Sequence, residues 1–364
     1  MQQFERPYTL AKTVTHLAAT VIHDYRTIVI NFFAALALLL TFAFPSFALD
    51  ATTPLQGAAQ AVETAIDKQT PAEKVGRKPK VALALGGGGT RGFAHIGVLR
   101  VLQREGIPID MIAGTSMGAI VGGMFCAGLT PDQIETKMLH KSFAHSYYTV
   151  PIPVRVAVIP IFFVPHLFGY HPYDGLYVGN KFANYMNNSL PATRRDIEEL
   201  KIPYCAVAAN LLDGKAYAIK TGNLGRAIQA SSAVPELRRP VAIDDKLFVD
   251  GGIAANLPVI QAKEMGADLV IGIDVDEKFD AKRQDFRKIL SVGHRVINMI
   301  LTKVDEDQVK AADLVVQPDV NGIHLLSSKV ADGKKAIKAG EAAAEAALPE
   351  IRSRIQAATI AANQ

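Results

Sequence analysis

The 364-residue chain has few cysteines and no concentrated run of basic residues, and both absences limit what it can do. Its two cysteines fall in separate stretches, Cys126 in a helical one and Cys205 in an apolar, strand-like one. Neither belongs to a metal-ligand pattern, and we expect both to be buried thiols rather than a bridge, even in an oxidising compartment. A formal net charge of +4 without a basic block gives no indication of nucleic-acid binding. No internal repeat is visible.

One long apolar run is present, at residues 28–44 (IVINFFAALALLLTFAF), and basic residues precede it. A small-x-small ending at 46–48 is typical of a signal-peptidase site, so we expect residues 1–48 to be a cleaved signal peptide. An uncleaved anchor is the alternative, since the run approaches spanning length. Both interpretations predict export across the inner membrane, to the periplasm or cell envelope. Residues 49–79, rich in Ala, Thr, Gln, Pro and Lys, are expected to be a linker.

The stretch 81–127 contains the most informative pattern of the sequence. VALAL at 81–85 is a short apolar run that ends at glycine, as in a buried parallel strand. Four glycines follow at 86–89, and a backbone without side chains there can adopt positive φ and leave N–H groups unpaired. Apolar residues then recur at helical spacing, which predicts a helix after Gly92. A second short strand is predicted at 109–113.

The turn after that second strand reads Gly114-x-Ser116-x-Gly118. A serine between strand and helix sits in a strained turn, and small flanking residues let the chain pass close by. Its hydroxyl then projects at the start of the next helix, where the dipole favours developing negative charge. Because a glycine turn on the preceding strand could supply an oxyanion hole, we interpret Ser116 as a candidate nucleophile.

Three motifs in order resemble the patatin-like phospholipase family: Gly86-Gly87-Gly88-Gly89-Thr90-Arg91-Gly92, Gly114-Thr115-Ser116-Met117-Gly118 and Asp250-Gly251-Gly252. The resemblance implies an α/β three-layer sandwich with a mainly parallel central sheet covered by helices. It spans a catalytic domain at 80–276, and residues 277–364 would complete that domain with helices. The implied activity is hydrolysis of fatty acyl esters, of the phospholipase A or lysophospholipase type.

The resemblance also implies roles for individual residues. Ser116 is the nucleophile and Asp250 the general base of a serine–aspartate dyad, with an oxyanion hole formed by the backbone of Gly87, Gly88 and Gly89. Arg91 and the adjacent Gly92 are expected to stabilise the loop or to contact a phosphate of the substrate. Gly114 and Gly118 flank the nucleophile, and Gly251 and Gly252 follow the acid. No metal or cofactor is implied; the expected partners are a phospholipid or other acyl ester and a membrane surface, and the oligomeric state is open.

Asp250 has a second, independent argument. It ends a strand-like segment, and strand ends of a parallel sheet share the edge at which such folds bind ligands, so we expect it beside Ser116. A serine hydroxyl needs a base to become a good nucleophile, and desolvation would raise the proton affinity of this carboxylate. A turn aspartate that bonds its own backbone is the alternative.

Three other functions compete with this interpretation. Gly87-x-Gly89-x-x-Gly92 fits a dinucleotide-binding loop, but such a site needs an acid at the exit of the second strand, where Ser116 stands. A three-residue hydrolase would need a histidine after the acid, which leaves His294 or His324. The third alternative is a non-catalytic envelope binding protein on the same fold.

Two segments carry further expectations. Residues 147–169 are strongly apolar and aromatic but are broken by four prolines, which excludes a straight spanning helix. We expect a lid or membrane-contacting edge over Ser116, with a buried insertion as the alternative. The ASSAVP run at 230–235 also resembles the family, whereas residues 236–239 (ELRR) depart from the small or aromatic residues expected there, which puts the shape of one pocket wall in question.

Overall fold

A computed structural model describes residues 77–149, 173–279, 282–287 and 291–363, all within one compact unit, Pro71–Gln364. Its sheet has eight strands in the order β5-β6-β3-β2-β1-β7-β8, with β4 paired to β3. The strands are β1 Val81–Leu85, β2 Met111–Thr115, β3 Tyr204–Asn210, β4 Ala216–Ile219, β5 Val241–Ile243, β6 Lys246–Asp250, β7 Leu269–Ile273 and β8 Leu314–Val316. The predicted signal segment 1–48, residues 49–76 of the predicted linker 49–79, and residues 150–169 of the apolar segment lie outside the described residues.

The centre of the sheet is parallel, as predicted. β1 pairs in parallel with β2 on one side and β7 on the other, and β2–β3 and β7–β8 are parallel as well. Every residue of β1 is buried. Leu83 packs into one hydrophobic cluster and Ala84 into another, because successive side chains of a strand point to opposite faces. The sheet therefore needs helices on both faces.

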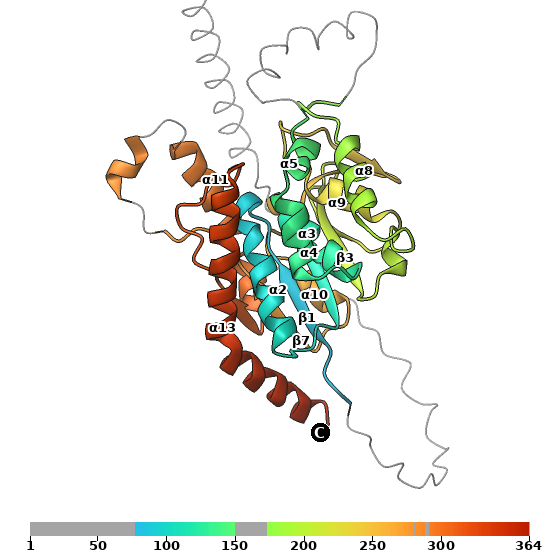
Figure 1. Ribbon diagram of the computed structural model, residues 1–364, viewed down its shortest axis with the longest axis vertical. Coiled ribbons are helices and arrows are strands. Elements are labelled where there is room, and N and C mark those ends of the chain that lie inside the picture. The colour runs from blue at the N-terminus through green and yellow to red at the C-terminus, as the bar shows by residue number, and fades with distance from the viewer. Residues whose placement is uncertain (1–76, 150–172, 280–281, 288–290, 364) are drawn as a thin grey trace, which may run out of the picture. The chain divides into compact units, whose positions relative to one another are not determined.

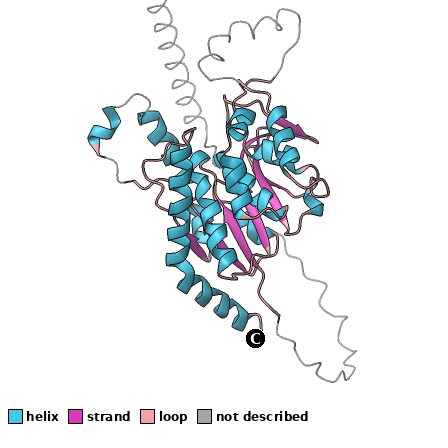
Figure 2. Ribbon diagram, in the orientation of Figure 1, coloured by secondary structure: helices cyan, strands magenta, loops and turns pink. Residues whose placement is uncertain are grey.

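Helices form those two outer layers (Figure 1, Figure 2). α2 (Ala94–Arg104), α3 (Met117–Cys126) and α13 (Val330–Ala361) share the larger cluster, while α10 (Val259–Glu264) packs in the cluster on the other face. The fold is thus the expected α/β sandwich. Among the described residues, no helix is both long and apolar enough to cross a membrane. The other helices are α4 Pro131–Leu139, α5 Lys141–Tyr147, α8 Asn180–Ser189, α9 Leu224–Ser231, α11 Ser291–Val304 and α12 Glu306–Ala311, with 3-10 turns η1 Gly89–Phe93, η3 Ile197–Glu199, η4 Gly251–Ile253 and η5 Arg283–Arg287.

The C-terminal helix α13 lies directly against α2 (Figure 1). Their backbones touch at two glycines: a Cβ on Gly97 would lie 2.1 Å from Ile337 O, and one on Gly340 would lie 1.9 Å from Ala94 O. Any larger side chain at either position would push the helices apart. Since α2 follows the glycine loop directly and α13 packs against α2, α13 supports the position of that loop.

The strand that carries Asp250 runs in an unexpected direction. We placed Asp250 at a strand end of a parallel sheet, but β6 is antiparallel to β3. The residue still reaches the correct edge because β3 extends beyond β2. Thr115 at the end of β2 pairs with Val207, and β6 runs back along the extension of β3 until Asp250 pairs with Ala208. The predicted location is therefore correct, and the predicted reason for it is wrong.

Two local patterns in the sequence predict structure: Thr-Pro-Asp-Gln at 130–133 is typical of a capped helix start, and Asp213-Gly214 between two apolar stretches is typical of a hairpin turn. Thr130 caps α4 in a capping box, accepting from Gln133 N at 3.2 Å while Gln133 Oε1 accepts from Thr130 N at 2.9 Å. β3 and β4 form the predicted antiparallel hairpin around its Asp-Gly turn. Cys126 and Cys205 are both buried free thiols, as predicted.

Candidate active site

Ser116 occupies a sharp turn between β2 and α3. Its φ of 51° and ψ of −114° are rare for a residue with a side chain, so the surrounding structure must hold this strained conformation. The flanking glycines make the turn possible: a Cβ on Gly118 would lie 2.1 Å from Leu85 O, and one on Gly114 would lie 2.6 Å from Gly118 O. The Ser116 side chain remains half-buried, and so partly accessible, at the start of α3.

Ser231, the last residue of α9, holds the backbone of this turn. Its hydroxyl accepts from Ser116 N at 2.9 Å and donates to Val207 O at 2.6 Å. The side chain is fully buried, so both hydrogen bonds are shielded from water. Sequence reasoning missed this role, although Ser231 lies within the ASSAVP run at 230–235 that was noted as resembling the family.

Asp250 lies beside the Ser116 hydroxyl. That hydroxyl donates to Asp250 Oδ2 at 2.7 Å, and Gly252 N donates to Oδ1 at 2.9 Å. Burial raises the pKa of Asp250 to about 6, although both hydrogen bonds favour the charged form. The turn bond to Gly252 is the alternative role that we considered for an isolated aspartate; here Asp250 makes it and contacts the serine as well.

No histidine takes part in this pair within the described residues, where the Asp250 carboxylate accepts from Ser116 and Gly252 alone. His324 is exposed in the segment after β8, and His294 belongs to α11. A histidine that we did not single out, His95 in α2, is fully buried with Nε2 2.8 Å from Gly86 O. Burial lowers its pKa to about 4, so it is neutral and supports the glycine loop as a hydrogen-bond donor.

One of the three predicted oxyanion-hole donors, the N–H of Gly87, is wrong. Gly87 N donates to Asn256 O at 3.0 Å, so its N–H is not available for an oxyanion. Gly88 N–H and Gly89 N–H make no hydrogen bond with any described residue. Met117 N–H, the amide that follows the nucleophile, is likewise unpaired in the described part of the chain. These three amides, rather than Gly87, Gly88 and Gly89, are the available donors.

The reason for glycine also differs from our expectation at Gly88. Its φ of 163° is extended backbone, so it needs no left-handed conformation. A Cβ there would instead lie 2.7 Å from Val275 Cγ2. Gly89 is the residue with positive φ, at 51°, and a Cβ on it would lie 2.1 Å from Leu325 O. The loop is thus closed on one side by β7's exit and on the other by the segment after β8.

Arg91 points into the protein rather than toward solvent. Its guanidinium is buried, with Nε donating to Ile323 O at 2.8 Å and an ion pair to Glu277 at 2.9 Å. Asn298 of α11 accepts from it at 3.3 Å. Of the two roles predicted for Arg91, these contacts favour holding the loop. Gly92 lies against the nucleophile helix, since a Cβ on it would be 2.6 Å from Met117 Cγ.

Asn256 connects the two halves of the site. Its carbonyl accepts from Gly87 N, while its Oδ1 lies 3.1 Å from the position of a Cβ on Gly252. Its amide nitrogen donates to Asp276 at 3.4 Å. Gly251 packs more tightly than Gly252, because a Cβ on Gly251 would lie 2.2 Å from Val207 O. One residue therefore contacts both the glycine loop, through its carbonyl oxygen, and the Asp250 turn, through its side chain.

Residues 236–239, which depart from the family pattern, include a buried cation, Arg238. Arg238 is almost fully buried and lies 4.3 Å from the ring centre of Tyr147 and 5.0 Å from that of Phe182. Its NH1 donates to Tyr147 O, and the Tyr147 hydroxyl donates to Ser232 O at 2.8 Å, next to Ser231. Burial lowers the pKa of Arg238 and raises that of Tyr147. This wall is therefore a cation–π stack beside the dyad.

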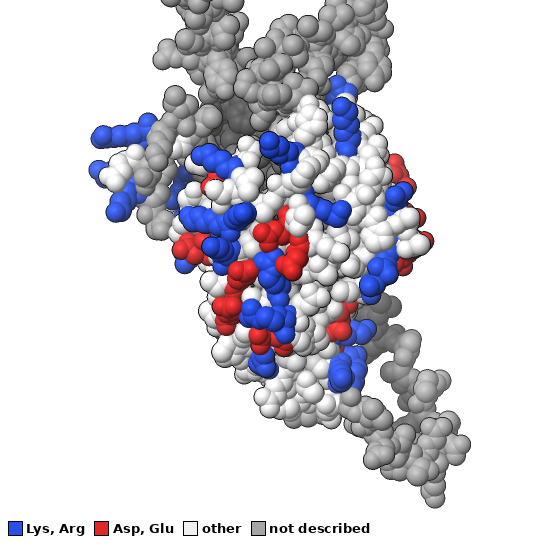
Figure 3. Space-filling view, in the orientation of Figure 1, with Lys and Arg blue, Asp and Glu red and all other residues white. Residues whose placement is uncertain are grey.

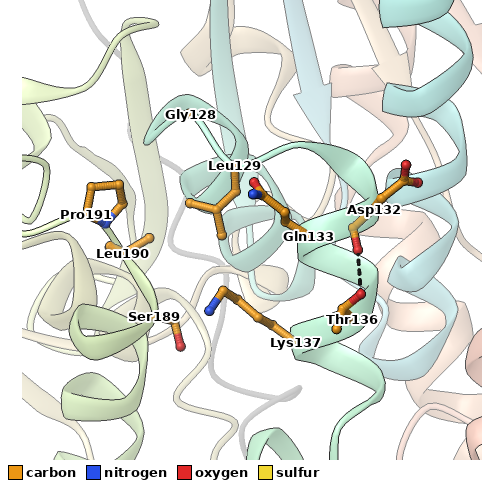
Figure 4. A pocket seen from close by; sticks show the side chains of 9 residues that line it. All are labelled: Gly128, Leu129, Asp132, Gln133, Thr136, Lys137, Ser189, Leu190 and Pro191. Atoms are coloured by element: carbon orange, nitrogen blue, oxygen red, sulfur yellow. Dashed lines mark hydrogen bonds between the residues drawn. The ribbon is translucent and has the colours of Figure 1, made fainter.

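A groove of about 680 Å³ lies elsewhere on the described surface, between α4 and the end of α8 (Figure 4). Gln133 and Lys137 of α4 face Leu190 and Pro191 across it. It includes neither Ser116 nor Asp250, so we assign the site from the dyad. Among the described residues, no group of three or more His, Cys, Asp or Glu side chains could hold a metal ion.

The architecture and the Ser116–Asp250 pair define the class: an α/β protein with a serine–aspartate pair at a nucleophile turn. A sequence model described as patatin-like phospholipase matches residues 83–263. The chain therefore belongs to the patatin-like phospholipase family.

Two individual proteins show the same relationship by sequence. An uncharacterized NTE family protein of Mycobacterium tuberculosis is 36% identical over 198 residues, covering 54% of this chain and 49% of that protein. Human patatin-like phospholipase domain-containing protein 6 is 32% identical over 215 residues, which are 58% of this chain and 14% of that protein. The match thus spans about half the length of the mycobacterial relative. The crystal structure of VipD from Legionella pneumophila aligns with a TM-score of 0.43 and 14% identity, over 75% of this chain and 67% of that one.

Proposed function

We propose that the protein is a serine lipid acyl hydrolase, of the phospholipase A or lysophospholipase type, with Ser116 as nucleophile and Asp250 as general base. The observation that carries the proposal is the 2.7 Å hydrogen bond from Ser116 Oγ to Asp250 Oδ2 at a strained strand-to-helix turn. A phospholipid supplies the ester, which is the substrate class that the family description supports.

In the first half-reaction, Asp250 takes the proton of Ser116 as Oγ attacks the ester carbonyl. The carbonyl oxygen becomes an oxyanion, stabilised by the unpaired N–H groups of Gly88, Gly89 and Met117. Asp250 then gives the proton to the departing alcohol, which leaves an acyl group on Ser116. In the second half-reaction Asp250 takes a proton from water, the resulting hydroxide attacks the acyl carbonyl, and the fatty acid leaves while Ser116 regains its proton.

A pKa near 6 suits this alternation, because Asp250 is ionised at neutral pH yet basic enough to accept a proton. Ser231 supports the chemistry without contacting the ester, by holding the Ser116 backbone in the strained turn. The N-terminal run at 28–44 extends the proposal to location: we expect the enzyme to act in the cell envelope, where phospholipid is at hand.

The test is fatty-acid release by the purified full chain from a phospholipid, a lysophospholipid and a short soluble ester. Wild type should release fatty acid from lipid, and Ser116→Ala and Asp250→Asn should each lower the rate by about three orders of magnitude. Ser189→Ala, a serine whose hydroxyl bonds only its own helix, is the matched control and should keep full activity. Hydrolysis confined to the short ester would replace a lipid hydrolase by a carboxylesterase of non-lipid esters.

A further inference from the structure

The outer face of α11 is apolar and exposed. Val292 is 57% exposed, Met299 53% and Ile300 46%, and Ile297 beside them is 51% exposed. Residues 292, 299 and 300 lie on one side of the helix, because positions seven and eight apart return to the same face. Large apolar side chains gathered on one exposed face mark an interaction site more often than ordinary surface.

The inner face of the same helix is polar where it is buried. Asn298 is 1% exposed and accepts from Arg91, while Thr302 donates to Asp276 at 3.4 Å. Leu301 lies close to Gly252, 3.5 Å from the position of a Cβ on that glycine. A surface helix normally buries its apolar side and exposes its polar side. Here the inner contacts belong to the active site, and the apolar side faces outward.

Aromatic and basic residues extend this face at the N-terminal side of α11. Phe279 is 56% exposed and Phe286 37%, and both rings lie next to the guanidinium of Arg295, at 5.0 and 6.0 Å. Between residues 278 and 303 the sequence has seven basic and two acidic residues. Figure 3 shows Lys and Arg side chains gathered over the protruding segment at the left, which is orange in Figure 1 and includes exposed Arg283 and Arg287.

We propose that this docking face, formed by Phe279, Phe286, Val292, Ile297, Met299 and Ile300 with the surrounding basic residues, binds the surface of an anionic lipid bilayer. The inference rests on the proposed function, since it says how a lipid hydrolase reaches its substrate. Exposed apolar and aromatic side chains among Lys and Arg are what an interfacial helix needs to enter the headgroup region of anionic lipid. A protein partner would need acidic groups and a complementary apolar surface, whereas the bilayer offers both over any area.

The position of the docking face supports this occupant. The opposite side of α11 contacts the turn that follows Asp250 and the arginine that holds the glycine loop. A bilayer against the outer face would therefore lie about one helix diameter, roughly 10–12 Å, from the dyad turn.

The chain contains no tryptophan, which allows a reporter at a single position. The test uses the full chain with Ser116→Ala, so that no lipid is consumed, and adds either Ile300→Trp or the matched control Leu212→Trp, a 67% exposed leucine at the β3–β4 turn. Fluorescence is recorded with phosphatidylcholine vesicles, with and without phosphatidylglycerol, and with brominated lipid as quencher.

We expect a blue shift and quenching for Ile300→Trp with anionic vesicles, and neither change for Leu212→Trp. The pair Arg283→Gln and Arg287→Gln should weaken this response by about fivefold for each charge removed. Met299→Ser should weaken it by several-fold while leaving the melting temperature unchanged, because that side chain contacts solvent. These readouts need no catalysis, so vesicle binding by the Ser116→Ala chains together with no lipid hydrolysis by wild type would refute the proposed function alone.

Three results would overturn the docking face. No response of Ile300→Trp to anionic vesicles would show that the face does not reach the bilayer. A blue-shifted spectrum before vesicles are added would mean that residues 28–44 or a second copy of the chain already covers it, and a dependence on protein concentration would identify the second copy. An equal response from Leu212→Trp would mean that another part of the chain drives binding without orienting this face.

Discussion

Replacing Asp250 by asparagine should abolish hydrolysis and, at neutral pH, stabilise the folded protein. The structural reason is that the carboxylate is buried beside Ser116 with hydrogen bonds from Ser116 and Gly252 alone among the described residues, which do not offset its desolvation. Burial therefore raises the pKa of Asp250 from 3.8 to about 6. An amide of the same shape keeps the bond from Gly252 N without carrying a charge.

The magnitude follows from proton linkage. The folded protein binds this proton more tightly than the unfolded chain, so folding stability falls as the pH rises from about 4 to about 6, and stays lower above that. Because the pKa rises from 3.8 to about 6, and each pH unit between these values corresponds to about 1.36 kcal/mol, the ionised carboxylate costs the folded state about 3 kcal/mol. For a domain of this size, that is roughly 6 °C in melting temperature.

The assay compares the melting temperatures of wild type and Asp250→Asn across pH. We expect the variant to melt higher at pH 8 and the two proteins to converge near pH 4, where the wild-type carboxyl is protonated. Wild-type kcat/KM should fall about tenfold per unit below pH 6. Burial also raises the pKa of Asp305, to about 7, so this residue is the control. Asp305→Asn should leave the pH at which kcat/KM falls to half its maximum unchanged. If Asp250→Asn were less stable than wild type at every pH, the reasoning would be refuted.

Two further changes test how the turn and the loop are held. Gly89→Ala should lower activity and melting temperature together, because φ is 51° and Leu325 O lies 2.1 Å from the new Cβ. The control Gly106→Ala, at a glycine with φ of 66° and open space around it, should cost only about 1–2 kcal/mol of stability and keep full activity. Equal stabilities of the two variants would contradict this. Ser231→Ala should lower kcat by about tenfold to a hundredfold with KM nearly unchanged, because it releases the Ser116 backbone, and an unchanged kcat in steady-state kinetics would remove Ser231 from the site.

Much of the site could be predicted because its signals are local. The glycine loop, the serine turn and the capping box each depend on neighbouring residues, and each forms where the sequence indicated. The pairing direction of β6 was not predictable in the same way. It depends on how far β3 extends past β2, which is a property of two distant strands and leaves no mark near Asp250.

The donors of the loop illustrate the same limit. The Gly87 N–H donates to the carbonyl oxygen of Asn256, which lies far along the chain. No motif around the loop could therefore have excluded Gly87 as an oxyanion-hole donor. Ser231 was within a noted run, but its contact with Ser116 N depends on how α9 packs against β3. The outward apolar face of α11 had a sequence signal, apolar residues at helical spacing. That spacing alone favours a buried face and cannot tell which side packs inward.

The central claim is that Ser116 forms the acyl-enzyme and Asp250 activates it without a histidine. Labelling of the full chain by a fluorophosphonate, followed by mass mapping of the modified peptide, tests it most directly. We predict one adduct on Ser116, no adduct in Ser116→Ala, labelling slowed about a hundredfold or more in Asp250→Asn, and labelling within about tenfold of wild type in His294→Ala and His324→Ala. An adduct on another residue, normal labelling of Asp250→Asn, or loss of labelling in either folded histidine variant would contradict the account.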